Sequence, residues 1–222
     1  MQPQESAVQA RQVILYAAGG HSKSVISTLV ETPSWDIAGL INVHPVERPE
    51  AVLGFPVLGD DTVLPDLLAR GLRHIHLCMG DNQERAEAGQ RLKAMGFELA
   101  TIQHPSAKMC PFSEVGAGTF MHMYSLMGAE CVAGEGCIIQ PFVNTGHGTR
   151  LGNYVQLAPG VNTGGDCVIE DQVFIGLGAA VMPGLRIGRN AIIGANAVVR
   201  EDVPDNAVVV GNPGRVIKIK SV

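Results

Sequence analysis

Apolar residues recur at every sixth position from Val115 to Val199, without a slip in register over 85 residues. Twelve of these fifteen positions carry Val, Ile, Leu or Met. The next residue is Gly at nine of the fifteen, and the residue two places earlier is small or β-branched at fourteen. The fifteen positions are Val115, Met121, Met127, Ala133, Ile139, Thr145, Leu151, Leu157, Thr163, Ile169, Ile175, Val181, Ile187, Ile193 and Val199.

A period of six fits neither the ~3.6 residues per turn of an α-helix nor the period of ~2 of a single strand. It is typical of a solenoid whose coil has three flat faces, each made of one short strand and one corner. Glycine fits corners that need a positive φ. Fifteen hexads shared among three faces give five coils. Residues 106–222 are therefore predicted to form an all-β domain, a hexapeptide-repeat parallel β-helix.

The first hundred residues follow a different rule, in which strands alternate with helices. Strands are expected at 13–16, 37–41, 75–79 and 97–102. Helices are expected to begin near Ser22, Asp61 and Gln83, with Asp61 as an N-cap and Gly96 as the C-cap of the last helix. Alternation of this kind indicates a parallel sheet. Residues 1–105 are therefore predicted to form a Rossmann-like α/β domain.

Composition and charge narrow the classes of function. The chain has 222 residues and a formal charge of −5, which argues against a dedicated nucleic-acid binder. No apolar run reaches the ~20 residues of a membrane span. The N-terminal residues lack the apolar stretch of a signal peptide, and the five cysteines contain no CxxC pair. We therefore expect a cytoplasmic protein with reduced thiols.

Several short motifs occur in a fixed order between Val13 and Arg215. They are Gly19-Gly20-His21-Ser22-Lys23, Leu53-Gly54-Phe55-Pro56-Val57-Leu58-Gly59, Gly80-Asp81-Asn82 with Arg85, His104-Pro105-Ser106-Ala107 and Val208-Val209-Val210-Gly211-Asn212-Pro213. In these motifs the chain resembles bacterial nucleotide-sugar acetyltransferases of the sialic-acid O-acetyltransferase and perosamine or bacillosamine N-acetyltransferase group. The resemblance implies a left-handed β-helix, a homotrimer with active sites between subunits, acetyl-CoA as co-substrate, and a place in glycan or lipopolysaccharide synthesis.

The glycines Gly19 and Gly20 stand between a predicted strand and a predicted helix. Glycines there let backbone N–H groups approach an anion at the helix N-terminus, although a tight structural turn is an alternative interpretation. By resemblance, this loop binds the nucleotide diphosphate, His21 lies near the sugar, and Gly80 lines the same pocket. Asn42 occupies one of two positions where relatives carry acidic residues that contact the nucleotide, and it can still form hydrogen bonds with a base.

His147 is the candidate general base. It follows Thr145 and Gly146, so the six-residue register places it at a corner rather than in the core. By resemblance it takes the proton that an attacking amine loses, which a neutral imidazole can do near pH 7. Relatives carry Asp or Glu directly after this histidine, where this chain has Gly148, and a second histidine where it has Gln156. An amine needs a weaker base than a hydroxyl does, so these departures favour N-acetylation.

The resemblance assigns contacts with acetyl-CoA to Gln156, Leu177 and Ala195. No metal is expected, because His74 and His76 share one face of a predicted strand without a third ligand. Three functions remain open. They are acetyl transfer from acetyl-CoA to a nucleotide-linked amino-deoxysugar, O-acetylation of a sugar or sialic acid, and non-catalytic binding of a nucleotide sugar.

Overall fold

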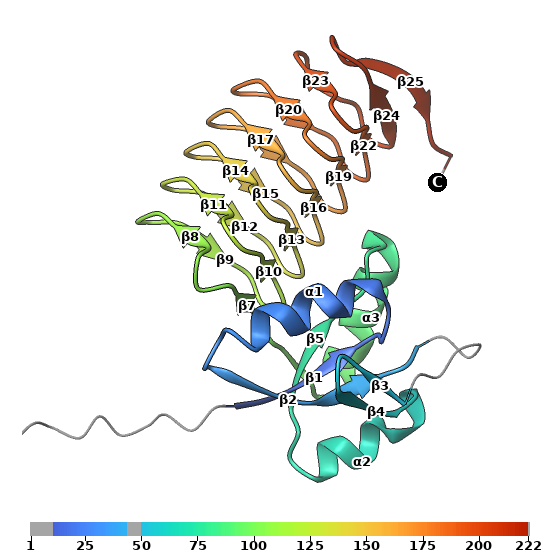
Figure 1. Ribbon diagram of the computed structural model, residues 1–222. Coiled ribbons are helices and arrows are strands. Elements are labelled where there is room, and N and C mark those ends of the chain that lie inside the picture. The colour runs from blue at the N-terminus through green and yellow to red at the C-terminus, as the bar shows by residue number, and fades with distance from the viewer. Residues whose placement is uncertain (1–10, 44–49, 222) are drawn as a thin grey trace, which may run out of the picture.

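The computed structural model describes residues 11–43 and 50–221; residues 1–10, for which no signal peptide is expected, lie outside them. The N-terminal domain holds a six-stranded sheet in the order β3-β4-β2-β1-β5-β6, in which only β3 and β4 pair antiparallel (Figure 1). Its elements are β1 (Arg11–Tyr16), α1 (Gly20–Leu29), β2 (Trp35–Ile41), β3 (Ala51–Val52), β4 (Phe55–Gly59), a 3₁₀ turn (Asp61–Val63), α2 (Leu64–Ala69), β5 (His74–Leu77), α3 (Asn82–Met95) and β6 (Glu98–Leu99).

The alternation of side chains along β1 gives this domain two apolar layers. Val13 and Leu15 pack with residues of α1, whereas Ile14 and Tyr16 pack with residues of α2 and α3. All four side chains are buried. Successive side chains of a strand point to opposite faces, so one strand anchors helices on both sides of the sheet. The predicted Rossmann-like arrangement is confirmed.

Two boundaries differ from the expectation. Asp60 rather than Asp61 caps the turn before α2, because its carboxylate accepts a hydrogen bond from the Thr62 amide at 3.1 Å. Asp61 instead accepts one from the Tyr16 hydroxyl at 2.8 Å. The expected strand at 97–102 is divided: β6 pairs with β5, and β7 (Ile102–Gln103) pairs with β10 of the solenoid. The chain therefore enters the solenoid at Ile102.

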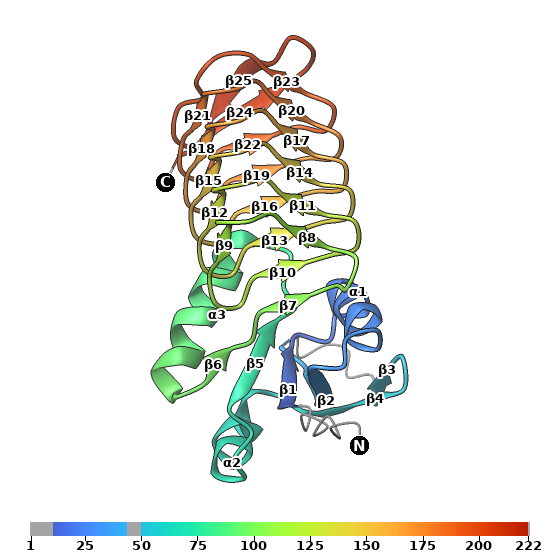
Figure 2. The same ribbon diagram turned by 90° about the vertical axis from the view of Figure 1, so that its left-hand side faces the viewer.

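The remainder of the chain winds as the predicted left-handed parallel β-helix (Figure 2). The first face contains β7, β10 (Phe120–Met121), β13 (Ile138–Ile139), β16 (Gln156–Leu157), β19 (Phe174–Ile175), β22 (Ile192–Ile193), β24 (Ala207–Val210) and the antiparallel β25 (Arg215–Ile219). The second contains β8 (Lys108–Met109), β11 (Leu126–Met127), β14 (Asn144–Thr145), β17 (Asn162–Thr163), β20 (Ala180–Val181) and β23 (Val198–Val199). The third contains β9 (Glu114–Val115), β12 (Val132–Ala133), β15 (Arg150–Leu151), β18 (Val168–Ile169) and β21 (Arg186–Ile187).

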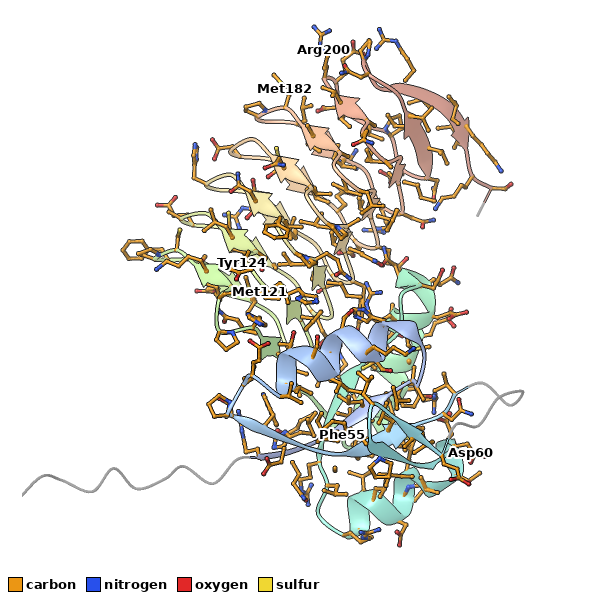
Figure 3. The ribbon with its side chains drawn as sticks, in the orientation of Figure 1. Phe55, Asp60, Met121, Tyr124, Met182 and Arg200 are labelled. Carbon is orange, nitrogen blue, oxygen red and sulfur yellow. The ribbon has the colours of Figure 1, made fainter. Side chains whose placement is uncertain are left out.

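Each coil repeats the same inward packing. Partners in neighbouring coils are 18 residues apart, as in the pair Met121 and Ile139, and both side chains are 0% exposed. The six-residue aliphatic positions thus form the solenoid core, together with the small residues Cys131, Cys137 and Cys167. At the corners the pattern reverses, and side chains such as Tyr124 extend into solvent (Figure 3).

Arg85 joins the two domains. The side chain lies on α3 and is only 1% exposed. Its guanidinium donates hydrogen bonds to the carbonyls of Gly136 (2.9 Å) and Tyr154 (3.0 Å) in the solenoid, and to Asn82 Oδ1 (2.8 Å) in its own helix. Burial lowers the Arg85 pKa to about 10. Because Phe120 and Ile138 of the first face also enter the core of the α/β domain, that domain is fixed against the first coils.

Candidate functional site

The loop after β1 leaves room for a ligand at the start of α1. Gly19 is the N-cap of α1, and its own carbonyl accepts a hydrogen bond from the Ser22 hydroxyl at 2.6 Å. A Cβ placed on Gly19 or Gly20 would meet nothing within 4 Å. The free N–H groups of this first turn therefore face an open surface, the geometry that suits a phosphate.

His21 closes the inner side of this loop. Its ring packs edge-on against Phe120 with 5.5 Å between centroids. Burial, followed by the nearby His76, Arg85 and His122, lowers the His21 pKa to about 3, so the imidazole is neutral at pH 7. Its Nε2 is buried and has no hydrogen-bond partner among the described residues. A buried nitrogen without a partner is costly unless a ligand supplies one.

Asn42 and Gly80 lie at the same edge of the sheet as this loop. They follow β2 and β5, the two neighbours of β1, so all three loops leave the carboxyl ends of adjacent parallel strands. Asn42 is 5% exposed, and Gly80 lines a cavity of about 350 Å³ that reaches Phe174 and Lys220. Ligands of open α/β sheets bind at this edge.

Gln156 faces the α/β domain from the first face of the solenoid. It lies in β16, one coil beyond Ile138, which is itself covered by that domain. Its Oε1 is buried and lacks a hydrogen-bond partner within residues 11–43 and 50–221. Gln156 thus belongs with the loop residues on one side of the molecule.

His147 lies at the opposite side of the coil. It occupies the corner between β14 of the second face and β15 of the third, and that corner is the vertex across from the first face. Its side chain is 73% exposed, and its Nδ1 lies 3.8 Å from Asp166 Oδ1 in the next coil. Leu177 and Ala195 are exposed at a third place, on successive coils of the corner between the first and second faces. A single chain does not bring these three groups together.

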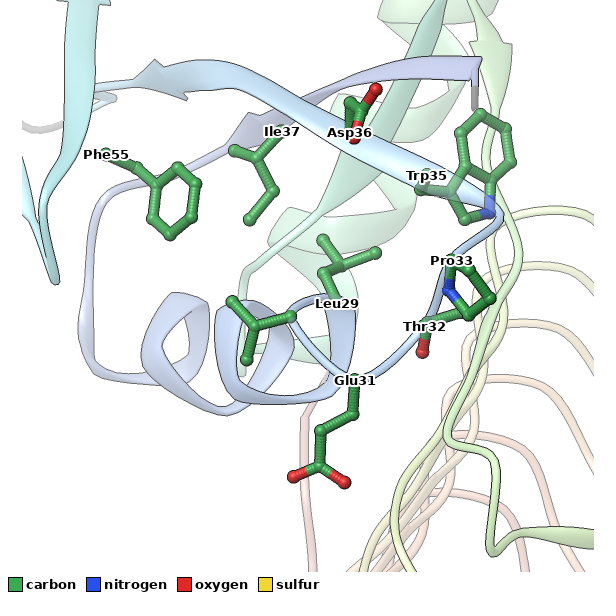
Figure 4. A pocket seen from close by; sticks show the side chains of 9 residues that line it. Leu29, Glu31, Thr32, Pro33, Trp35, Asp36, Ile37 and Phe55 are labelled. Atoms are coloured by element: carbon green, nitrogen blue, oxygen red, sulfur yellow. The ribbon is translucent and has the colours of Figure 1, made fainter. Parts of the chain in front are cut away.

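Other features of the molecule carry no chemistry of this kind. A cavity of about 420 Å³ lies between Leu29, Trp35 and Phe55, at the amino end of β2 and away from the loops (Figure 4). No cluster of three or more His, Cys, Asp or Glu residues suited to a metal ion occurs in the described ranges. None of the helices described is long and apolar enough to cross a membrane.

Comparisons with known proteins agree with this architecture. The PglD N-terminal domain family matches residues 12–92, and the bacterial transferase hexapeptide family matches residues 166–201. The structure of PerB from Caulobacter crescentus in complex with CoA and GDP-perosamine is 33% identical, with a TM-score of 0.88 over 93% of this chain and 97% of PerB. The chain belongs to the hexapeptide-repeat nucleotide-sugar acetyltransferases.

Two further relatives of this acetyltransferase extend the comparison. The acetyltransferase domain of PglB from Neisseria gonorrhoeae in complex with acetyl coenzyme A is 27% identical, with a TM-score of 0.85 over 94% of this chain and 100% of that domain. A galactoside O-acetyltransferase from Lactococcus lactis is 51% identical over 39 residues, 18% of this chain and 19% of that protein. The matched segments span about a fifth of the length of such curated relatives.

One residue of this acetyltransferase that the sequence analysis missed is Asp166. Its carboxylate lies beside His147 although the two residues are 19 positions apart. The signal was present in the sequence, because adding the coil length of 18 residues to Gly148 gives Asp166. The expectation that His147 lacks a nearby carboxylate is therefore wrong, and the reason is that the carboxylate comes from the next coil.

Proposed function

We propose that this protein transfers the acetyl group of acetyl-CoA to the amino group of a nucleotide-linked amino-deoxysugar. The observation that carries the proposal is its likeness over 97% of PerB, whose structure contains CoA and GDP-perosamine. The exposed imidazole of His147 supports it, because acyl transfer to an amine needs a base at an accessible surface.

The reaction places a simple demand on His147. The sugar nitrogen attacks the thioester carbonyl, a C–N bond forms, and the C–S bond breaks as CoA leaves. The nitrogen must lose a proton, which His147 Nε2 accepts and can return to the leaving sulfur. Backbone N–H groups stabilise the oxyanion of the tetrahedral intermediate.

The nucleotide sugar belongs at the carboxyl edge of the α/β sheet in this proposal. The open N–H groups at Gly19 and Gly20 receive the diphosphate, and His21 Nε2 gains the partner that it lacks. Gly80 lines the same edge, and Asn42 offers its amide to the base. Gln156, Leu177 and Ala195 are assigned to acetyl-CoA.

Because His147 lies at the vertex opposite the first face, we infer that each active site is shared between subunits of a homotrimer. His147 of one chain then faces the substrate loops of its neighbour, and acetyl-CoA lies in the groove between the two solenoids. A scattering mass of about 70 kDa, three times 23.4 kDa, is expected. A monomeric mass at micromolar concentration would contradict the arrangement.

Subunit mixing tests the shared site directly. His147→Ala and His21→Ala chains are each expected to be inactive alone. Co-expressed at equal levels, they should recover about a quarter of the wild-type activity, because one interface in four then combines an intact His147 with an intact His21. No recovery would place both residues in the same chain's site.

O-acetylation by the same groups is the second candidate, and the short match to a galactoside O-acetyltransferase favours it. The carboxylate of Asp166 removes the argument that His147 is too weak a base for a hydroxyl. It also removes one of the two departures that suggested a non-catalytic homologue. The N-acetyl reading rests on the likeness to perosamine N-acetyltransferase, 31% identical over 97% of that chain.

A thiol-release assay separates these functions. Acetyl-CoA is offered with UDP-, GDP- and dTDP-linked amino sugars and with their hydroxy counterparts. We expect turnover with one amino sugar, and a fall in kcat of ~10²-fold or more in His147→Ala, the usual scale for a lost acid–base group. Turnover with hydroxy sugars alone would select O-acetylation. An unchanged rate in His147→Ala would remove that residue as the base.

A further inference from the structure

We propose that Asp166 is the positioning residue that orients His147, replacing a carboxylate that relatives carry in the adjacent sequence position. The inference rests on the proposed function, since it concerns the same base. Asp166 Oδ1 lies 3.8 Å from His147 Nδ1, close enough for charge to act across the pair. The two residues are also held by their backbones, because the Asp166 N–H donates to the His147 carbonyl at 2.7 Å.

Two glycines make the space for this pair. A Cβ on Gly165 would lie 2.5 Å from His147 Cε1, so only glycine leaves room for the imidazole over the next coil. A Cβ on Gly148 would collide with Asp166 Oδ1. The missing side chain at 148 and the carboxylate at 166 are therefore one feature: each coil provides the gap that the other coil fills.

The backbone allows the carboxylate at either place. Five residues of the His147 corner occupy the same left-handed turn position in successive coils, with φ of 64° at Phe112, 62° at Glu130, 66° at Gly148, 57° at Asp166 and 73° at Gly184. Aspartate and asparagine adopt this conformation more readily than most residues. A carboxylate can therefore move between positions 148 and 166 without a change in the turn.

The position of Asp166 decides which nitrogen of His147 is free. A carboxylate beside Nδ1 favours the tautomer whose proton is on Nδ1. The lone pair is then on Nε2, the atom available to an incoming amine. Asp166 does not touch the substrate in this scheme; it sets the tautomer and the ring orientation.

The test removes the carboxylate and then moves it. Asp166→Asn keeps the shape and the turn, and it should lower kcat about tenfold, the lower end of the range for a lost orienting partner, with KM within about twofold. Gly148→Asp together with Asp166→Gly should restore most of kcat. Glu130→Gln is the matched control: it removes a carboxylate at the same turn position one coil earlier and should leave kcat unchanged. Melting temperatures of all four proteins are compared.

The outcomes are distinguishable from a failure of the proposed function. A kcat within twofold of wild type in Asp166→Asn, with His147→Ala inactive, would overturn the role of Asp166 and leave the base intact. A loss that Glu130→Gln shares, or that the exchange of Gly148 and Asp166 does not recover, would overturn it as well. If His147→Ala is fully active, the base assignment and this inference fail together.

Discussion

The α/β domain and the solenoid solve the problem of placing a histidine in opposite ways. His147 stands on a corner that the repeating core does not use, and its side chain is 73% exposed. His21 stands at a junction that occurs once in the molecule, packed against Phe120 with its Nε2 buried. In the solenoid a reactive group is added to a scaffold that packs without it. In the α/β domain the proposed binding group is part of the packing.

The largest effect is expected where the two regions meet. Arg85→Met would leave the carbonyls of Gly136 and Tyr154 and the amide oxygen of Asn82 without their donor. Unpaired buried polar groups cost about 1–3 kcal/mol each, so the free energy of unfolding should fall by at least about 3 kcal/mol in urea titration. Arg91→Met on the same helix is the control, because the Arg91–Asp61 pair is exposed and worth about 1 kcal/mol or less. Equal losses would show that the junction is not the weak point.

The next effect tests the repeat itself. A Cβ on Gly146 would lie 2.5 Å from the carbonyl oxygen of Gly164 and from the amide nitrogen of Gly165, both backbone atoms of the next coil. Gly146→Ala should therefore lower the free energy of unfolding by about 2–3 kcal/mol, as overpacking does. Gly19→Ala, with open space around it and a φ of −88°, should change it by less than about 0.5 kcal/mol while weakening nucleotide-sugar binding. A stable Gly146→Ala protein would contradict the close approach of the coils.

The solenoid could be predicted almost completely from the sequence, because one local rule is repeated. The aliphatic positions such as Ile139 and Ile175 are buried as the period of six requires. The α/β domain was predictable in its elements but not at its limits. The expected strand at 97–102 is divided because Ile102 pairs with Phe120, a contact between residues 18 positions apart that no local pattern contains.

The candidate site shows the same division. The corner position of His147 followed from the register, and Asp166 was within reach of the same arithmetic. The burial of His21 was not, since it depends on Phe120 and His76, which come from a distant strand of the solenoid and from β5. Contacts between the two domains are set by side-chain packing, and a single sequence carries no periodic signal for them.

The smallest effect concerns the buried histidines of the junction. His76 is 1% exposed, its Nδ1 lies 2.7 Å from the Ala100 carbonyl, and burial lowers its pKa to about 4. Because the unfolded chain has a histidine pKa near ~6.5, it binds more protons than the folded chain between that pH and about 4. The stability contributed by the neutral ring is fully present above the unfolded pKa and is lost as the pH falls through this window. His76→Asn should therefore reduce the loss of unfolding free energy between pH 7 and pH 5 by roughly 1–2 kcal/mol. Arg91→Met, which removes no group that titrates there, should keep the wild-type slope; the same slope in His76→Asn would show that the histidine is not held neutral by the junction.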